Sequence, residues 1–365
     1  MNLTKNKQII PIFFASDNNY APYLAVTLSS LLANASSEYF YKIHILTSNI
    51  SEDNKQKINK LNKENSSIEF ISLAKQLEQI KDKFHLRDYY SLETYYRFFI
   101  ADMFPEYDKV IYLDCDLIVL GDISDFYYTN ISNYLLGAVQ DQVFAMYKPF
   151  DEYAEKALGL KVRNVFNAGV LLMNTKLFRA YHVQERFFKM MERFKFRVTQ
   201  DEDYLNVICK DRVKYLSIGW NKMCFDFPGF DNVDLQLIHY NLHSKPWHYE
   251  NVMYEEYFWQ YAYNTDYYDF IVQELHSYSD ERKLKDIKSF ETLQSIAMED
   301  ISDPDNYKRT IERESRRHYI RRGLNSIARL PGIKGISRFF TSQGYKILYE
   351  YTKYQQRQNK NYGTK

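Results

Sequence analysis

The sequence predicts an α/β fold organised around a mainly parallel β-sheet. Short apolar runs alternate with helical stretches of about a dozen residues through the first half of the chain, which is typical of βαβ units. Acidic turns follow two of these runs, at Asp17 and at Asp114, where a parallel sheet usually binds its ligands. Of the 365 residues, 45% are hydrophobic and 26% are charged, so the composition is globular and excludes wholesale disorder.

Strands are expected where β-branched and aromatic residues form short runs, and helices where apolar residues recur every three or four positions. The expected strands are residues 9–14, 41–46, 67–71, 109–113, 135–139 and 169–173. The first helix is expected from Pro22, because proline suits a first helical turn. Further helices are expected over 51–62, 94–103, 176–194 and 201–209, followed by a Tyr-rich helical region over 254–290. Residues 142–164 are expected to cover the site as a lid.

The formal net charge of +1 conceals a basic tail on an acidic body. Residues 309–365 carry fourteen Lys and Arg against three Glu, an excess of +11 that leaves −10 for residues 1–308. Such a tail suits an anionic membrane surface, near which each basic residue contributes about 1 kcal/mol. The alternative is that the apolar face of the tail packs on the body or on a second subunit. In the second case the chain would form an oligomer.

Other functional classes have weaker support. No apolar run approaches the ~20 residues that a membrane span needs. The basic tail carries no nucleic-acid-binding signature, so no nucleic acid partner is expected. Three scattered cysteines without a CxxC pair fit a reducing, cytoplasmic setting. The chain is therefore expected in the cytoplasm, peripherally bound to the inner face of the cytoplasmic membrane.

The pattern Asp114-Cys115-Asp116 lies between two apolar runs. Two carboxylates in such a setting are costly to bury unless they are paired or bind a cation. With one residue between them, both can reach the same metal ion from a turn at a strand end. A divalent cation held in this way can bridge the phosphates of a nucleotide diphosphate. The alternative is a solvated turn, because a D-x-D pattern also arises by chance.

His239 and Lys245 form a second candidate cluster. His239 closes the apolar run 235–238, where a lone histidine is usually a core residue with one hydrogen bond. Lys245, followed by Pro246 and Trp247, is a point charge of the kind that neutralises a phosphate. An imidazole added to a carboxylate pair favours Mn²⁺ as the cofactor over Mg²⁺, which the carboxylates would also accept.

Two further patterns offer polar groups at the ends of expected elements. In the run 166–170 (FNAGV), the amide of Asn167 can donate to and accept from sugar hydroxyls. The neighbouring Ala168 and Gly169 allow a ligand to approach the backbone closely. Residues 201–203 put three acids into the first turn of an expected helix, where they complement the helix dipole. That role accounts for Asp203, but three acids exceed what it requires.

Six motifs in sequence order resemble glycosyltransferase family 8, most closely the bacterial lipopolysaccharide α-galactosyl- and glucosyltransferases. They are 15–20 (ASDNNY), 91–97 (SLETYYR), 112–116 (YLDCD), 166–170 (FNAGV), 200–206 (QDEDYLN) and His239-Tyr240 with Lys245-Pro246-Trp247. Each motif alone is loose, but six with family-like order and spacing are specific. The resemblance implies a Rossmann-like GT-A fold, a UDP-sugar donor, Mn²⁺ and retention of the anomeric configuration. We expect a GT-A catalytic domain over 1–270, a helical connecting segment over 271–308 and a basic amphipathic C-terminal tail over 309–365.

The resemblance also assigns roles to the candidate residues. The nucleotide is expected at residues matching uracil and ribose contacts and at their neighbours, namely Asp17, Asn19, Tyr20, Ala15 and Cys115. The metal ligands are expected to be Asp114, Asp116 and His239, and Lys245 resembles the diphosphate contact. The donor sugar is expected at Arg97, Asn167, Ala168, Gly169 and Asp201. The catalytic candidates are Glu202, Asp201 and Asp141, of which Asp141 matches a sugar or acceptor contact.

Two residues depart from the family pattern. Family members often have Gln where this chain has Glu202, beneath the reacting sugar carbon. A carboxylate there is competent as the nucleophile of a double displacement. Front-face substitution, with Glu202 only stabilising positive charge, is the favoured interpretation. Leu242 replaces a Gly that the family commonly carries between His239 and Lys245, which leaves the path of that loop open.

The expected reaction is transfer of galactose or glucose from a UDP-hexose to a cell-surface glycan or glycolipid acceptor, such as lipopolysaccharide. One alternative is a transferase that acts on a glycosylated surface protein. The other is a non-catalytic GT-A partner subunit, against which the intact Asp114, Asp116, His239 and Lys245 argue. A degenerate subunit has no reason to retain a costly metal cluster.

Overall fold

The computed structural model describes residues 7–73, 92–226, 228 and 233–327, with side chains through residue 322. Residues 1–303 form one compact unit and residues 304–365 form another. The first unit contains the β-sheets and all of the candidate site residues. Ser91 lies outside the described residues. Of the apolar face expected in the tail from Ile320 onward, only the Ile320 side chain is described.

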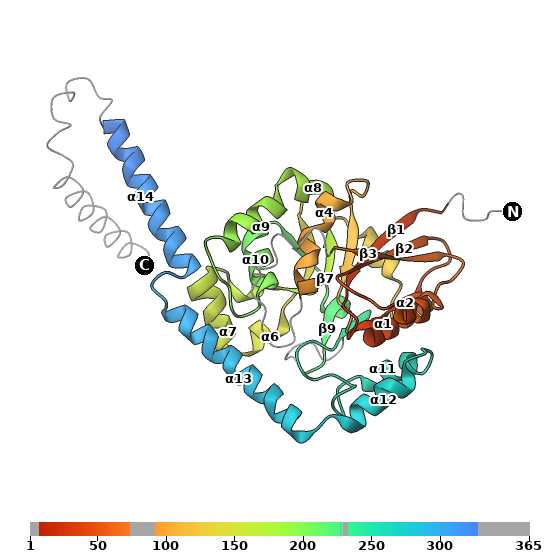
Figure 1. The fold of residues 1–365 in the computed structure, drawn as a ribbon. Coiled ribbons are helices and arrows are strands. Elements are labelled where there is room, and N and C mark those ends of the chain that lie inside the picture. Colours follow the sequence, from red (N-terminus) through yellow and green to blue (C-terminus); the bar gives the residue numbers. More distant parts are fainter. Residues whose placement is uncertain (1–6, 74–91, 227, 229–232, 328–365) are drawn as a thin grey trace. The chain divides into compact units, whose positions relative to one another are not determined.

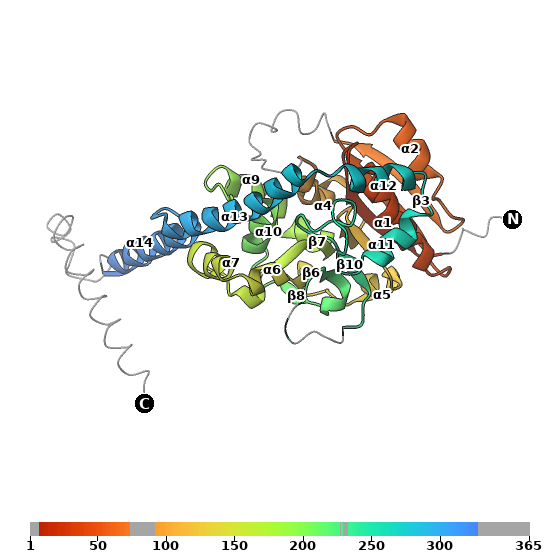
Figure 2. The same ribbon diagram turned by 90° about the horizontal axis from the view of Figure 1, so that it is seen from below.

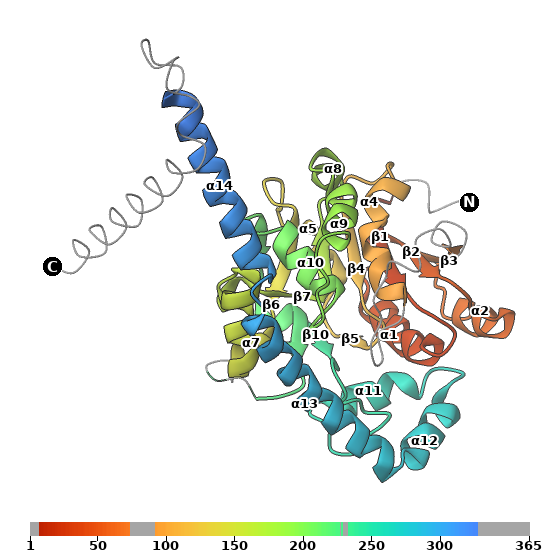
Figure 3. The ribbon, with the colours of Figure 1, turned by 60° about the vertical axis from the view of Figure 1, so that its left-hand side comes forward.

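A seven-stranded sheet forms the centre of the first unit (Figure 1). The order of its strands is β3-β2-β1-β4-β7-β6-β8. Its strands are β1 (Ile9–Ala15), β2 (Phe40–Thr47), β3 (Ser66–Ser72), β4 (Val110–Leu113), β6 (Leu136–Gln140), β7 (Phe166–Met173) and β8 (Val213–Tyr215). The pairs β1–β2, β2–β3, β1–β4 and β6–β8 are parallel, whereas β7 runs antiparallel between β4 and β6 (Figure 3). The prediction of a mainly parallel sheet is confirmed, with β7 as the exception.

A second, three-stranded sheet brings two distant motifs together. It consists of β5 (Leu117–Val119), β10 (Leu237–His239) and β9 (Lys222–Met223), none of which was expected as part of one sheet. Strand β10 pairs antiparallel with β5, and this register sets His239 opposite Leu117. The histidine therefore lies next to Asp116 although 123 positions separate them in the sequence.

The helices follow the expected order with two corrections. They are α1 (Ala21–Asn34), α2 (Glu52–Asn59), α4 (Ile100–Met103), α5 (Ile123–Tyr128), α6 (Gln142–Met146), α7 (Lys148–Tyr153), α8 (Thr175–Ala180), α9 (Val183–Met191), α10 (Asp201–Ile208), α11 (Glu255–Ala262), α12 (Tyr268–Ser277), α13 (Asp280–Ser302) and α14 (Tyr307–Ile327). The helix expected over 94–103 is a 3₁₀ segment, η3 (Leu92–Phe98), followed by the short α4. The helix expected over 176–194 is two helices, because His182 adopts a left-handed backbone with φ 53°.

Helix α1 holds the turn that carries the paired aspartates. The hydroxyl of Thr27 lies 2.9 Å from the carbonyl oxygen of Cys115 and 2.8 Å from that of Leu117, and it accepts from the Leu117 N–H at 3.2 Å. The hydroxyl of Ser30 accepts from the Val119 N–H at 3.0 Å. Both hydroxyls are buried, so they satisfy backbone groups that would otherwise be costly to bury beside the short strand β5.

Helix α13 runs along α7 (Figure 2). Leu293 and Ala297 of α13 are buried, and the Phe290 ring packs edge-on against Tyr147 at 5.0 Å and Phe150 at 5.9 Å. At the same helix, Tyr249 and Tyr278 both donate to one oxygen of Asp286, at 2.7 and 2.8 Å. Helix α13 therefore contacts both the segment expected to be a lid and the loop that follows His239.

The second unit contains α14, whose described side chains include seven basic residues: Lys308, Arg309, Arg313, Arg316, Arg317, Arg321 and Arg322. Arg313 donates to Asp305 at 2.6 Å within the same unit. Among the described residues, no helix combines the length and the apolar character that a bilayer crossing requires.

Asp203 joins α10 to α7 from a buried position. One of its carboxylate oxygens accepts from the Tyr153 hydroxyl at 2.9 Å and from the Thr199 N–H at 3.0 Å. Burial raises the pKa of Asp203 from 3.8 to about 7. The folded chain therefore keeps this carboxyl protonated over a pH range in which the unfolded chain has lost the proton.

We predict that this carboxyl makes the fold less stable as the pH rises from about 4 to about 7, because in that range the folded state binds more protons than the unfolded state. The Asp203→Asn variant keeps an oxygen acceptor for both donors and cannot titrate. Its free energy of unfolding should fall less over this range than that of the wild type, by as much as about 4 kcal/mol. Urea unfolding at several pH values measures both curves, and parallel curves would contradict the prediction.

Candidate active site

A cavity of about 340 Å³ opens where β1 and β4 end and where the antiparallel β7 begins. Its lining contains every residue that the sequence singled out for nucleotide, sugar, metal or catalytic roles. These residues are Ala15, Asp17, Asn19, Tyr20, Arg97, Asp114, Cys115, Asp116, Asp141, Asn167, Ala168, Gly169, Asp201, Glu202, His239 and Lys245. The structure brings them to one place, and the role of each stays a prediction.

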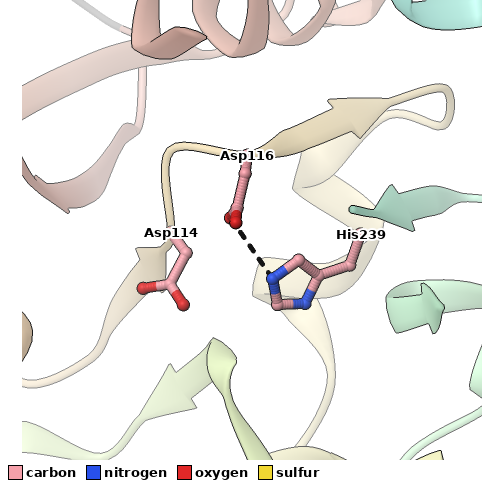
Figure 4. A group of neighbouring side chains, drawn as sticks. All are labelled: Asp114, Asp116 and His239. Atoms are coloured by element: carbon pink, nitrogen blue, oxygen red, sulfur yellow. Dashed lines mark ion pairs between the residues drawn. The ribbon is translucent and has the colours of Figure 1, made fainter. Parts of the chain in front are cut away.

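Asp114, Asp116 and His239 point toward one another from the turn between β4 and β5 and from the end of β10 (Figure 4). One ligand atom of each lies within 4.8 Å of the others. His239 Nε2 lies 3.3 Å from Asp116 Oδ1. Two carboxylates and an imidazole at this separation can hold a divalent cation.

Gly169 makes the close approach of these ligands possible. A Cβ atom at this position would lie 2.5 Å from His239 Cε1 and 2.6 Å from Asp114 Oδ2. Both distances are far below van der Waals contact. The backbone of Gly169 also accepts from the Asp114 N–H at 2.8 Å, so the glycine forms one wall of the cluster.

Lys245 lies at the same cluster and is buried. Its ammonium pairs with Asp116 Oδ2 and donates to the Tyr240 carbonyl. Burial by itself would raise the pKa of Asp116, but the charge of Lys245 and the adjacent His239 ring lower this pKa below its usual range. Asp116 is therefore held as a carboxylate.

Leu242, in the loop between His239 and Lys245, adopts a left-handed backbone with φ 58°. A glycine would adopt this conformation without penalty, whereas an L side chain costs about 1–2 kcal/mol. Leu242 also lines the cavity. The loop thus keeps a glycine-like backbone with a leucine in it and carries strain at the site.

Arg97 joins four segments beneath the cavity. Its guanidinium pairs with Asp114 at 3.1 Å and Asp201 at 3.2 Å, donates to the Ala168 carbonyl, and lies 4.4 Å from the ring centre of Tyr112. Burial raises the pKa of Asp201 from 3.8 to about 6, although Arg97 opposes this rise.

A second group of acids lies around Asn167. The Glu202 Oε2 atom accepts from the Ala168 N–H at 2.8 Å and from Asn167 Nδ2 at 3.1 Å, and Asp141 Oδ2 accepts from the same Nδ2 at 3.3 Å. Burial raises the pKa of Glu202 well above its ordinary value, and the charge of Asp141 raises it further. Asp141 also accepts from the Phe144 N–H at 2.8 Å and so begins α6.

The end of the cavity beside the turn after β1 is more exposed to solvent than the end with the acids. Asp17 Oδ1 accepts from the Tyr20 N–H at 2.9 Å, which forms a tight turn immediately after β1. Cys115 donates from its thiol to the Ala15 carbonyl at 3.2 Å. This turn keeps the Asp17 and Asn19 side chains close to solvent at the cavity mouth.

Sequence reasoning missed two residues: Leu293, which lines the cavity, and Asn221, which lies outside the lining. Val143, Phe144, Phe150 and Leu293 form an apolar part of the lining, and Leu293 comes from α13. Asn221, which contacts His239, carries no motif of its own. Val143, Phe144 and Phe150 belong to the segment expected as a lid, whereas Leu293 and Asn221 acquire their positions through contacts distant in sequence that no local pattern could have identified.

The model of the family described as glycosyl transferase family 8 matches residues 11–251. A Haemophilus influenzae protein named as a glycosyltransferase is 32% identical over 216 residues, which cover 59% of this chain and 63% of that protein. The match thus spans less than two thirds of that relative.

Two galactosyltransferases are also similar to this chain. The lipopolysaccharide 1,3-galactosyltransferase of Salmonella typhimurium is 24% identical over 252 residues, which cover 65% of this chain and 72% of that protein. The galactosyltransferase LgtC, solved in complex with donor and acceptor sugar analogs, is similar with a TM-score of 0.60 and 27% identity. This similarity covers 70% of this chain and 96% of LgtC.

The structural similarity confirms the expected GT-A fold. The family model covers more than half of the chain and includes all six motifs in full. The chain therefore belongs to glycosyltransferase family 8.

Proposed function

We propose that the chain is a metal-dependent, retaining hexosyltransferase that moves galactose or glucose from a UDP-hexose to a glycan acceptor. The observation that carries this proposal is the cluster of Asp114, Asp116 and His239 within the cavity. The similarity to LgtC, whose structure contains donor and acceptor sugar analogs, supports a sugar-transfer reaction at such a cavity.

The cluster fits a divalent cation, with Mn²⁺ favoured over Mg²⁺ because one donor is an imidazole nitrogen. The glycine at position 169 supports this assignment, since any side chain there would enter the space between His239 and Asp114. When bound, the cation would stabilise the charge that develops on the diphosphate leaving group. Asp114, Asp116 and His239 would hold it.

The nucleotide would bind at the open end of the cavity. Asp17, Asn19 and Tyr20 would contact uracil and ribose, because the turn after β1 presents them at the cavity mouth. The neighbouring Ala15 and Cys115 would form the floor. Lys245 would exchange its pairing with Asp116 for the diphosphate, which lets a single buried ammonium serve the leaving group.

The donor sugar would lie over Asn167, Ala168, Gly169 and Asp201, with Arg97 beneath them. Glu202 and Asp141 are the acids on this side of the cavity, and their carboxyl oxygens would stabilise the positive charge of an oxocarbenium-like transition state. We propose front-face substitution, in which Glu202 stabilises charge and forms no covalent bond. The apolar lining contributed by α6, α7 and α13 leaves this end suited to the acceptor.

The acceptor is proposed to be a glycolipid or cell-surface glycan of the lipopolysaccharide kind. A similar chain is named as a lipopolysaccharide galactosyltransferase. The basic residues of 309–365 would dock the enzyme peripherally on the anionic inner face of the cytoplasmic membrane. In this proposal residues 1–270 form the catalytic domain and 271–308 connect it to the tail.

The first test is release of UDP by the purified full-length chain from a panel of UDP-sugars. Slow hydrolysis of UDP-galactose or UDP-glucose should appear with Mn²⁺ and disappear with EDTA. The Asp114→Asn/Asp116→Asn variant should lose at least about 100-fold in rate, because the transition-state charge is no longer neutralised. Absence of both UDP release and UDP binding with every sugar would contradict the proposed activity.

The second test concerns Glu202. If it only stabilises charge, Glu202→Gln should still release UDP, with a rate about 100-fold below that of the wild type. Intact-protein mass spectrometry of the wild type and the variant after incubation with donor should show no added hexose. A hexosyl adduct on Glu202, together with complete inactivity of Glu202→Gln, would instead establish the double displacement.

The third test deletes residues 309–365 and measures co-sedimentation with lipid vesicles. The full-length chain should bind phosphatidylglycerol vesicles and not phosphatidylcholine vesicles, and the truncated chain should bind neither. The full-length variant Arg316→Gln/Arg317→Gln/Arg321→Gln/Arg322→Gln should also bind more weakly than the wild type, because each lost charge removes about 1 kcal/mol. Unchanged binding of the truncated chain would refute membrane docking through the tail.

A further inference from the structure

Asn221 connects the two halves of the site through a single side-chain amide. It is the last residue of η6 (Ile218–Asn221) and is fully buried. Its Oδ1 lies 2.9 Å from His239 Nδ1, and its Nδ2 donates to Asn167 Oδ1 at 2.9 Å. His239 belongs to the metal cluster and Asn167 to the group of acids, so one amide contacts both.

The hydrogen-bond partners fix which end of each amide is the oxygen. The Gly169 backbone N–H donates to Asn167 Oδ1 at 3.0 Å. A backbone N–H can only donate, so this atom of Asn167 must be the oxygen. The Asn221 atom facing the same oxygen must then be its NH₂ group, and the Asn221 oxygen is left to face His239.

This polarity determines what the two neighbours present to the cavity. Because His239 Nδ1 faces an oxygen, it must carry a proton, which leaves Nε2 as the ring atom available to a cation. Because the Asn167 oxygen is engaged, its NH₂ group is directed at Glu202 and Asp141. The donor and acceptor of each hydrogen bond are therefore fixed from the Gly169 N–H, through Asn167 and Asn221, to His239.

The backbone of Asn221 is held as firmly as its side chain. Gln142, also fully buried, donates from Nε2 to the Asn221 carbonyl at 2.7 Å. The other end of the same glutamine amide accepts from the Met223 N–H at 3.2 Å. Gln142 directly follows Asp141, so the acid and the backbone of Asn221 are tied to the same turn.

We propose that Asn221 is a positioning residue for the transfer reaction. It orients the His239 ring for the cation through its oxygen and the Asn167 amide for the acids through its NH₂ group. The inference rests on the proposed metal-dependent function of the same site. It predicts that the two roles can be separated, because each uses a different end of one side chain.

The separating variants are Asn221→Asp and Asn221→Ala, made in the full-length chain. Asn221→Asp keeps an oxygen toward His239 and loses the NH₂ group toward Asn167. Its Kd for Mn²⁺ should stay within about 3-fold of the wild type or tighten, while kcat for UDP release falls about 10- to 100-fold. Asn221→Ala loses both contacts, so its Mn²⁺ affinity should also fall about 10- to 100-fold.

Asn174→Ala is the matched control for loss of a buried amide. Asn174 follows the far end of β7, and its amide also uses both ends, donating to the Ile131 carbonyl at 3.2 Å and accepting from the Leu177 N–H at 3.0 Å. This variant should lower Tm and leave the Mn²⁺ affinity unchanged. Equal loss of Mn²⁺ affinity in Asn221→Asp and Asn221→Ala, or no effect of either on Mn²⁺ affinity and kcat, would overturn the proposal.

A measurement on the wild type does not depend on how the variants fold. In EDTA-treated protein with ¹⁵N-labelled histidine, the spectrum should show a proton on Nδ1 of His239, assigned with a His239→Gln variant. An unprotonated Nδ1 would refute the inference even if the enzyme releases UDP. A protonated Nδ1 in a protein that neither binds Mn²⁺ nor releases UDP would support the geometry and reject the proposed function.

Discussion

The arrangement of the cavity depends on one buried guanidinium, that of Arg97. Its side chain is only 3% exposed, and a buried charge is tolerated when its partners are complete. Those partners are Asp114, Asp201, Thr94 and Ala168, which come from the ends of β4 and β7, from α10 and from η3 itself. Loss of Asp114 or Asp201 would leave the buried guanidinium with only one of its two carboxylate partners. Arg97 therefore fixes the relative positions of these segments, a role that precedes any contact with a sugar.

The strands that carry the site could be predicted because each is a continuous apolar run that ends in polar residues. Residues 109–113 and the acids after them are an example, and the structure has a strand at Val110–Leu113. The direction of β7 could not be predicted, because a fully buried run has the same composition in either direction. The short strands β5, β9 and β10 exist only through pairing with each other, so two or three residues of local sequence could not reveal them. The break between α8 and α9 at His182 could not be predicted either, because no Gly or Pro marks it in the sequence.

The candidate site, too, contains residues that could be predicted from the sequence and residues that could not. The residues that the motifs identified, such as Asp114 and Asn167, all line the cavity. They could be identified because acidic and small residues at the end of an apolar run form a pattern in the local sequence. Residues that matter through a partner far away in the sequence form no such local pattern. Asn221 matters through His239 and Asn167, and Leu293 reaches the cavity because α13 packs along α7. Although α13 lies beyond residue 251, where the family match ends, it contributes to the lining of the cavity.

The pairing of Lys245 with Asp116 has a thermodynamic consequence. An ammonium already neutralises one of the carboxylates that would hold a cation. A divalent ion arriving alone must break this pair and leave Lys245 buried without its counter-charge. An ion arriving with a diphosphate gives the ammonium a new partner at the same moment. Cation and nucleotide should therefore bind cooperatively, each raising the affinity for the other by the same factor. A site with this linkage binds the metal–nucleotide complex in preference to free metal ions, so the lysine acts as a selectivity element before any chemistry begins.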